Sequence, residues 1–275
     1  MSKFRLNTIM ILLFIIAISL IIASSAFAKI DPKTMVGLWL FDEGKGDTAK
    51  DSSGNGNDGV LKGNVKWVTG KFGSAVEFSG VEWVEVPDSD TLDMNKQITV
   101  MFWVRTNKVM KDMWADRQAV VGKHYLEYEV GIYMQGQIHT YTKNPAGAPD
   151  AYDEGIMVSM AGKLPTKEAD WELNKWYHIA WTLDKQKEVA YVNGIRLGEH
   201  TKANEGTKPG LHTLDIGRRQ GGGIPLSGAV DEVAIFNVAL GEDDIKLAAE
   251  KSLKSGGLAV SPLRKLTTTW ANIKR

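Results

Sequence analysis

Apolar and polar residues alternate with a period of two along several segments of the chain. The clearest is Ile98–Arg105, in which the even positions are Ile, Val, Phe and Val and the odd positions are Thr, Met, Trp and Arg. This alternation predicts a strand with one face in a core. Further strands are expected at Val36–Phe41, Ala75–Phe78, Trp83–Val86, Ala119–Gly122, Leu126–Met134, Gln137–Tyr141, Trp176–Asp184, Lys187–Val192, Ile195–Leu197, Leu214–Gly217 and Gly228–Phe236.

Turn residues separate these segments and join them without helices. Asn193-Gly194 stands between two apolar runs and predicts a two-residue hairpin turn. The helical pattern is confined to Glu242–Leu253, which Gly256-Gly257 ends. About a dozen short strands without intervening helices predict two antiparallel sheets face to face, an all-β sandwich or jelly roll with one short C-terminal helix. The unpatterned stretch Lys143–Asn174 is expected to be a long excursion at the rim of this sandwich.

Residues 1–28 have the pattern of a secretory signal peptide. Lys3 and Arg5 give a positive start, an apolar run covers Ile9–Ile22, and small residues stand at Ala26 and Ala28. Cleavage after Ala28 predicts a secreted or periplasmic protein. The alternative is an uncleaved membrane anchor, because the apolar run approaches the length that spans a bilayer. The rest of the chain is expected to form one domain at 29–257 and a separate tail at 258–275.

The composition argues against a nucleic-acid partner and excludes cysteine-based bonds. Lys plus Arg and Asp plus Glu number 33 each, so the formal net charge is zero. A nucleic-acid partner requires a basic face, so we expect none. The chain has no cysteine, which excludes disulfides, zinc–thiolate sites and cysteine nucleophiles. An exported chain without disulfides must depend for its stability on its core and on any bound cation.

An ordered set of motifs resembles the laminin-G-like jelly-roll family of the concanavalin-A-like lectin and glucanase superfamily. The resemblance implies a β-sandwich fold, and it spans roughly residues 36–253. It does not define one function, because this fold carries adhesion modules, lectins, glycosidases and lyases. The motifs are Gly37–Gly44, Asp51–Gly59, Gly70–Phe78, Val84–Pro87, Ile98–Val104, Trp176–Ala180, Tyr191–Gly194 and Gly228–Phe236.

The resemblance also implies a structural calcium ion where the first strand, the Gly/Asn-rich turn and the last strand meet. The matching positions are Asp42, Asn57 and Asp231, with Asp51 and Glu43 as alternates. Calcium takes six to eight oxygen ligands from carboxylates, amides and backbone carbonyls, which these segments offer. The alternative is that Asp51 and Asn57 only cap turns, and that Asp231 accepts hydrogen bonds from backbone amides.

Aromatic side chains in the middle of the chain are candidates for a glycan-binding surface, because sugars stack their C–H faces on exposed rings. Tyr152 and Trp171 lie in the irregular excursion and are the predicted ligand-binding residues. The alternative is that most aromatic residues belong to the core, as expected of Trp39, Trp103, Trp176 and Trp181 in regular strands. Other candidates near the middle loops are Tyr125, Tyr128, Tyr133 and Tyr141.

The sequence does not present a local catalytic pair. Glu82 and Glu85 are three positions apart and would point to opposite faces of a strand, as would the adjacent Asp231 and Glu232. Retaining glycosidases require two carboxyl groups about 5 Å apart. We therefore predict a non-catalytic module that binds a glycan or an extracellular protein. One alternative is a glycosidase or lyase whose catalytic pair of carboxylates comes from distant strands. Another is a structural cell-surface protein.

Two further features are expected to have structural roles. His178 lies inside the motif Trp176–Ala180 and is expected to be structural rather than a metal ligand. Arg218-Arg219 precede Gly221–Gly223, but the strand-to-helix context of a phosphate-binding loop is missing. This segment is therefore expected to be a flexible loop at the rim.

Overall fold

A computed structural model describes most of the chain beyond its N-terminal segment. The described residues are 30–108, 110–112, 115–133, 136–143, 152–158, 171–202, 206–207 and 209–254. The predicted signal peptide and the predicted tail at 258–275 lie outside them. Within the described part, no helix has the length and apolar character needed to cross a membrane.

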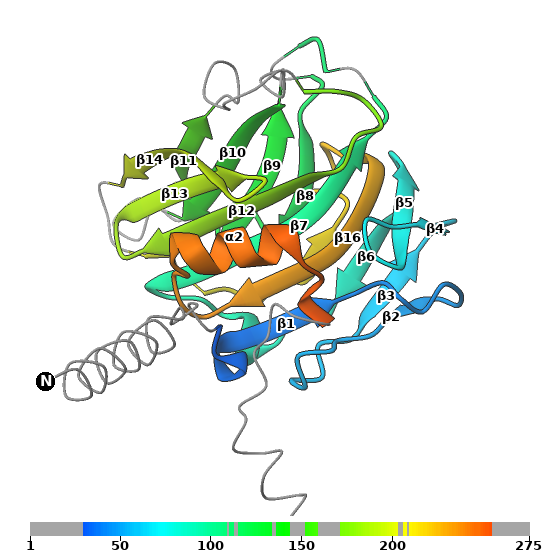
Figure 1. The fold of residues 1–275 in the computed structure, drawn as a ribbon, viewed down its shortest axis with the longest axis horizontal. Coiled ribbons are helices and arrows are strands. Elements are labelled where there is room, and N and C mark those ends of the chain that lie inside the picture. The colour runs from blue at the N-terminus through cyan, green and yellow to red at the C-terminus, as the bar shows by residue number, and fades with distance from the viewer. Residues whose placement is uncertain are drawn as a thin grey trace, which may run out of the picture.

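Two eight-stranded sheets with antiparallel pairing form the fold (Figure 1). Sheet A has the spatial order β14 (Ile195–Thr201), β13 (Lys187–Val192), β12 (Tyr177–Asp184), β7 (Gln97–Thr106), β16 (Ser227–Phe236), β5 (Ser74–Ser79) and β4 (Lys66–Thr69), with β1 (Met35–Trp39) also paired to β16. Sheet B has the order β11 (Tyr152–Val158), β10 (Gln137–Lys143), β9 (Tyr128–Tyr133), β8 (Gln118–Gly122), β15 (Leu214–Ile216), β6 (Trp83–Val86), β3 (Gly59–Lys62) and β2 (Thr48–Ala49). Among the described residues, the helices are the short η1 (Pro32–Thr34) and η2 (Asp90–Leu92) and the nine-residue α2 (Glu242–Glu250).

The interior between the sheets is built from the inward positions of both. All four even positions of Ile98–Val104 belong to this interior cluster, whereas Met101 belongs to a second cluster on the other face of sheet A. The predicted alternation of this strand is therefore confirmed. Trp39 and Trp181 are completely buried in the same interior, as expected of residues in regular strands. The predicted all-β sandwich with one C-terminal helix is confirmed.

Helix α2 covers part of the outer face of sheet A, the face that points away from the interior. Ile245 and Ala248 are buried in one cluster with Met101 and Ala180 of sheet A. In Figure 1 the helix crosses in front of β12, β7 and β16. The apolar odd positions of these strands thus have a partner, which explains why sheet A is hydrophobic on both faces in this region.

The first and the last strands of the described domain lie side by side. β16 pairs with β7 on one side and with both β5 and β1 on the other. Beyond α2, the backbone amide of Leu253 donates a hydrogen bond of 3.0 Å to Glu232 in β16. Ile30 and Leu253 are buried in the same outer cluster, so both ends of the domain are fixed against one face.

Several details of the expected strand order need correction. The stretch Lys143–Asn174 was expected to be irregular, but it contains β11, which pairs with β10 at the edge of sheet B. Gly59–Lys62 and Lys66–Thr69 are also strands that the alternation did not indicate. The Asn193-Gly194 turn is confirmed, because both residues have positive φ angles, 50° and 76°, and join β13 to β14.

Candidate functional site

The outer face of sheet B carries a row of charged and aromatic side chains. Val84 and Val86 in β6 point into the interior, so Glu85 between them points outward. Leu214 and Ile216 enclose Asp215 in the same way. Strand register aligns the outward positions in one row that crosses five strands, from β10 to β6: Tyr141, Glu129, Gly122, Asp215 and Glu85.

Two neighbouring arginines turn back over this row and pair with its carboxylates. Arg219 holds Glu129 with two hydrogen bonds of 2.8 and 2.6 Å, which is the bidentate geometry of a strong ion pair. Arg218 donates from Nε to Asp215 at 2.8 Å. Its guanidinium carbon also lies 3.4 Å from the ring centre of Trp83. Asp215 and Glu129 are buried beneath the arginines, whose side chains keep 20% and 16% of their surface exposed.

Glycine at position 122 makes room for the Glu129 side chain. A Cβ atom there would lie 3.0 Å from Cγ and 3.1 Å from Cβ of Glu129, which is too close for an undisturbed contact. The row therefore has no side chain between Glu129 and Asp215. Since neighbouring strands are about 4.8 Å apart, these two acidic positions are separated by roughly 10 Å at the backbone.

Aromatic rings enclose the Arg219 guanidinium. Tyr125 and Tyr141 lie with their ring centres 5.0 and 4.9 Å from it. Tyr133 and Tyr141 share a hydrogen bond of 2.8 Å between their hydroxyl groups, and His139 lies edge-on between their rings. Both ring nitrogens of His139 are buried, and within the described part of the chain neither has a hydrogen-bond partner. Burial, with the nearby charges of Arg219 and Arg117, lowers the pKa of His139 to about 3, so the ring is neutral at physiological pH.

A buried charge cluster holds the loop that carries Tyr125. Lys123 is fully buried and pairs with Asp88 at 2.8 Å, with Asp93, and with Glu127 at 3.3 Å. Since removal of one partner from a buried ion pair is strongly destabilising, these contacts fix the start and end of the loop between β8 and β9. Next to Tyr125, the ring of His124 stacks on that of His212 with centres 4.2 Å apart.

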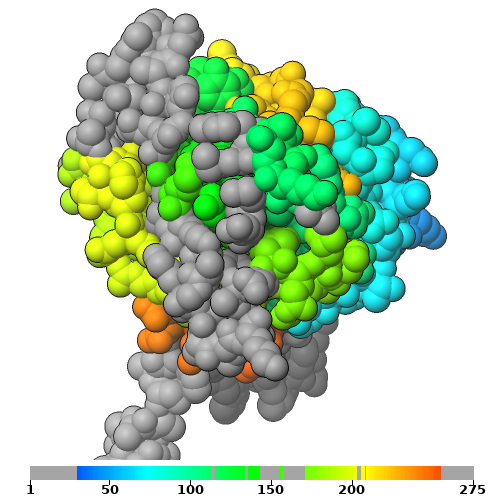
Figure 2. All heavy atoms as spheres, turned by 90° about the horizontal axis from the view of Figure 1, so that it is seen from above, coloured from blue at the N-terminus to red at the C-terminus, as the bar shows by residue number. Residues whose placement is uncertain are grey.

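Figure 2 shows the rim of the sandwich from above, with yellow and orange atoms from beyond residue 200 next to cyan atoms from the first third of the chain. Arg218 and Trp83, which come from these two parts of the chain, are in contact. The arginine loop is therefore held to sheet B by specific contacts, and the expectation of a flexible loop does not describe Arg218 and Arg219. The tip of the loop, Gly221–Gly223, is exposed, with φ angles of 79° to 103° that favour glycine.

The predicted aromatic ligand-binding residues have different positions. Tyr152 lies in β11 and pairs through its backbone with Lys143, while its side chain lies outside the described part. Trp171 is half-buried and packs against the interior cluster. Its ring stacks on Tyr177 with centres 4.3 Å apart, and its N–H donates to Thr106 at 2.7 Å. One face and the polar edge of Trp171 are therefore engaged within the protein.

The other tyrosines divide between the two sides of sheet B. Tyr125, Tyr133 and Tyr141 contribute to the outer face as described. Tyr128 instead belongs to the interior cluster, where its hydroxyl donates to the carbonyl of Leu92 at 3.1 Å. Alternation could have shown this, because Tyr128 shares its side of the strand with Val130 and Ile132.

The predicted calcium ligands do not form one group. Asp42 and Asp231 both accept hydrogen bonds from backbone amides at or next to the turn between β4 and β5: Ser74, the first residue of β5, donates to Asp42 at 3.3 Å, and Phe72 donates to Asp231 at 2.9 Å. Asn57 lies elsewhere, where its Nδ2 donates to the carbonyl of Val36 at 2.8 Å. Among the described residues, no cluster of three or more His, Asp or Glu side chains has a metal-binding arrangement.

The alternates fit turn capping better than metal binding. Asp51 accepts hydrogen bonds from the backbone amides of Leu38, Ser53 and Asn57 at 2.8 to 3.0 Å. Glu43 accepts from the amide of Lys50 at 2.9 Å. These are the contacts expected of side chains that hold a Gly/Asn-rich turn against the first strand.

One part of the predicted set retains the chemistry that a cation requires. Asp231 is completely buried, and its Oδ1 has no hydrogen-bond partner among the residues that the structure describes. Burial raises the pKa of Asp231 to about 7, because the charged form has lost its hydration. Asp42, beside the same turn, already pairs with the ammonium group of Lys254 at 2.7 Å. Asp42 and Asp231 thus both contact the segment between β4 and β5, whereas Asn57 does not join them.

Comparison with protein-family models assigns the chain to a family. The laminin-G-type model described as the concanavalin A-like lectin/glucanases superfamily matches residues 78–246, which is more than half of the sequence. The chain belongs to this superfamily, as its motifs indicated. Among curated proteins, none matches it significantly.

Solved structures of similar fold include binding domains. Domain 4 of AbnA, a GH43 extracellular arabinanase from Geobacillus stearothermophilus in complex with arabinotriose, has a TM-score of 0.57 and 18% identity, over 78% of this chain and 97% of that one. The binding domain of Paraclostridial Mosquitocidal Protein 1 has a TM-score of 0.64 and 17% identity, over 79% and 52%. The binding domain of Botulinum neurotoxin DC, in complex with rat synaptotagmin II, has 0.59 and 15%, over 80% and 52%. This chain thus matches about half of each toxin domain, and at these identities the likeness extends to the fold alone.

Proposed function

We propose that the chain is an exported, non-catalytic module that binds a glycan on the outer face of sheet B. The observation that carries this proposal is the pair of arginines, each fixed by a buried carboxylate and packed against aromatic rings. Guanidinium N–H groups donate to sugar oxygens, and aromatic rings contact the apolar faces of sugars. The site combines both kinds of group in fixed positions, which reduces the entropy lost on binding.

The carboxylates of this face suit a positioning role better than catalysis. Asp215 and Glu129 are buried beneath Arg218 and Arg219, and Glu85 pairs with Lys62 at 3.2 Å. A glycosidase needs one carboxylic acid that reaches the leaving oxygen and a second carboxylate at a matched distance. Carboxylates that are each paired with a cation from above do not offer these groups. Release of reducing sugar from a panel of polysaccharides would favour the alternative, a carbohydrate-active enzyme.

The glycan site can be tested by replacing one of its half-buried rings. We expect Tyr125→Ala to lower the affinity for the best-bound oligosaccharide of a panel by at least about tenfold, as measured by isothermal titration calorimetry. The control is Trp67→Ala, a half-buried aromatic in β4 of sheet A. Equal affinities in the two variants would place the glycan elsewhere. A folded protein that binds no glycan but retains an extracellular protein partner would overturn the glycan proposal itself.

We further propose a structural calcium ion held by the carboxylates of Asp42 and Asp231. The ion would neutralise a buried carboxylate and join the turn at Gly70–Ser74 to the last strand. Support comes from the unpartnered Oδ1 of Asp231 and from the shared turn. Binding to the folded state alone stabilises a protein by mass action, so EDTA should lower the melting temperature by several degrees.

Two variants separate this calcium site from the originally expected one. Asp231→Asn should abolish the response of the melting temperature to EDTA, because it removes the charge that the ion would neutralise. Asn57→Ala should destabilise the protein through its lost hydrogen bond to Val36 but keep the response. A melting curve that EDTA leaves unchanged in the wild type, with no calcium by elemental analysis, would eliminate the ion.

A further inference from the structure

We infer that the ligand of the outer face of sheet B is a neutral, hydroxyl-rich glycan rather than a uronic, sialylated or sulfated one. This inference rests on the proposed function and adds the chemical class of the ligand. It follows from how the charges of this face are compensated within the protein. The relevant surface consists of Trp83, Glu85, Tyr125, Arg218 and Arg219.

Each charge in the described part of this surface already has an opposite charge beside it. Arg219 is bound bidentately by Glu129, and Arg218 donates a single hydrogen bond to Asp215. Glu85 pairs with Lys62 at 3.2 Å, and both of these side chains remain about one-third exposed. These three pairs sum to zero net charge. Arg117 is a further basic residue, and it lies toward Tyr133 and His139 at the other end of the row.

The compensation comes from below, on the side away from a ligand. Glu129 and Asp215 are almost completely buried, whereas the two guanidinium groups retain part of their exposed surface. A sugar hydroxyl or ring oxygen can accept a hydrogen bond from a guanidinium without bringing any charge. An anionic ligand would lose its hydration against groups whose positive charge is already balanced, which disfavours its binding.

The arginines still have donors for such oxygens. Arg218 uses only its Nε for Asp215, so the N–H groups on its two terminal nitrogens have no partner among the described contacts. Stacking of the guanidinium on Trp83 fixes the plane in which these donors lie. A rigid donor edge beside an aromatic surface is suited to vicinal hydroxyl groups, which present two acceptors at a fixed spacing.

The test compares neutral and acidic oligosaccharides of equal length by isothermal titration calorimetry. We expect neutral pentose or hexose oligosaccharides to bind, with affinity that changes less than about twofold between roughly 50 and 500 mM NaCl. Binding of the acidic set alone, weakened by salt, would overturn this inference and leave the proposed function intact. Binding of neither set would overturn both.

Two variants sharpen the test by removing the compensating charge. Asp215→Asn should leave Arg218 uncompensated, so an oligogalacturonide should gain at least about tenfold in affinity and become sensitive to salt. If Asp215→Asn does not fold, Glu85→Gln removes one negative charge from the same surface at a partly exposed position, where it leaves Lys62 uncompensated. The matched control is Asp184→Asn, at an exposed position in β12 of sheet A. Variants that fold but do not gain acidic-ligand affinity would show that charge compensation does not set the ligand class.

Discussion

The outer faces of the two sheets use the same strand alternation for opposite purposes. On sheet A the outward positions include Met101 and Ala180, which α2 covers with Ile245 and Ala248. On sheet B the outward positions include Asp215 and Glu129, which are covered by arginines instead of a helix. These outward side chains are buried on both sheets, but those on sheet A are stabilised by removing apolar area from water and those on sheet B by completing ion pairs. The comparison distinguishes a face that a helix seals from a face that keeps partly exposed polar groups.

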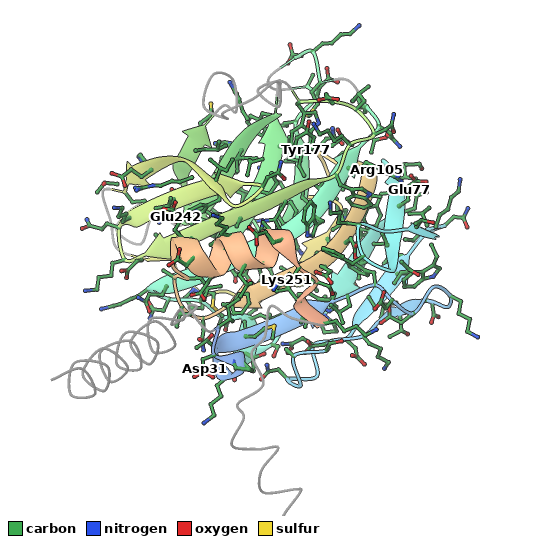
Figure 3. The ribbon with its side chains drawn as sticks, in the orientation of Figure 1. Asp31, Glu77, Arg105, Tyr177, Glu242 and Lys251 are labelled. Carbon is green, nitrogen blue, oxygen red and sulfur yellow. The ribbon has the colours of Figure 1, made fainter. Side chains whose placement is uncertain are left out.

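The largest expected effect comes from opening an ion pair on sheet B. Glu129→Ala leaves Arg219 without its buried partner, so we expect unfolding in urea to show a loss of about 3 to 5 kcal/mol. The matched change on sheet A is Glu77→Ala. Glu77 and Arg105 lie together near the surface (Figure 3), and their charged groups are 3.3 Å apart. Glu77→Ala should therefore reduce the free energy of unfolding by less than about 1 kcal/mol. Similar losses in the two variants would mean that the pair on sheet B is effectively solvated.

A somewhat smaller loss is expected on the apolar face. Ile245 is completely buried on the face of α2 that packs against sheet A, so Ile245→Ala should reduce the free energy of unfolding by about 2 to 4 kcal/mol. The exposed neighbour Lys246 offers a control, for which Lys246→Ala should remain within about 0.5 kcal/mol of the wild type. Glycan affinity should be unchanged in both. A loss of glycan binding in Ile245→Ala would show that the two faces are coupled.

The smallest effect is a pH dependence shared by one histidine on each sheet. Burial lowers the pKa of His178 on sheet A and of His139 on sheet B to about 3. The unfolded chain binds these protons below about pH 6.5 and the folded chain does not, so stability is present above that pH and is lost as the pH falls.

Each histidine should account for about 2 kcal/mol lost between about pH 6.5 and pH 5. His178→Phe and His139→Phe each remove one titrating ring of similar size. Urea unfolding of each variant should therefore show a smaller loss on acidification than the wild type. Identical pH profiles in wild type and variants would mean that these rings have the same pKa in the folded protein as in the unfolded chain.

Local patterns predicted most of the fold. The alternation of Ile98–Arg105, the Asn193-Gly194 turn and the helix near Glu242 are each set by neighbouring residues, and each was confirmed. β11 was missed because Tyr152–Val158 includes Asp153, Glu154 and Gly155, which weaken an alternating pattern. As an edge strand, β11 has a paired neighbour on one side only, so it needs less of that pattern.

The candidate site could not be predicted because it depends on pairing between distant residues. Arg219 and Glu129 are 90 positions apart, and only the register of five strands brings the row together. A partial signal was present, since Glu129 and Asp215 are acidic residues inside apolar strand segments. Buried acidic residues require partners, so each of them implied a basic side chain nearby.

The central position of β16 in sheet A has a consequence for how the chain matures. β1, β5 and β7 are all made earlier during synthesis, yet each has β16 as a neighbour. Until residue 236 has emerged, these three strands have unsatisfied edges that can pair with other chains. Sheet A can therefore be completed only after nearly the whole domain has been translated, and a product truncated before Ser227 is expected to aggregate.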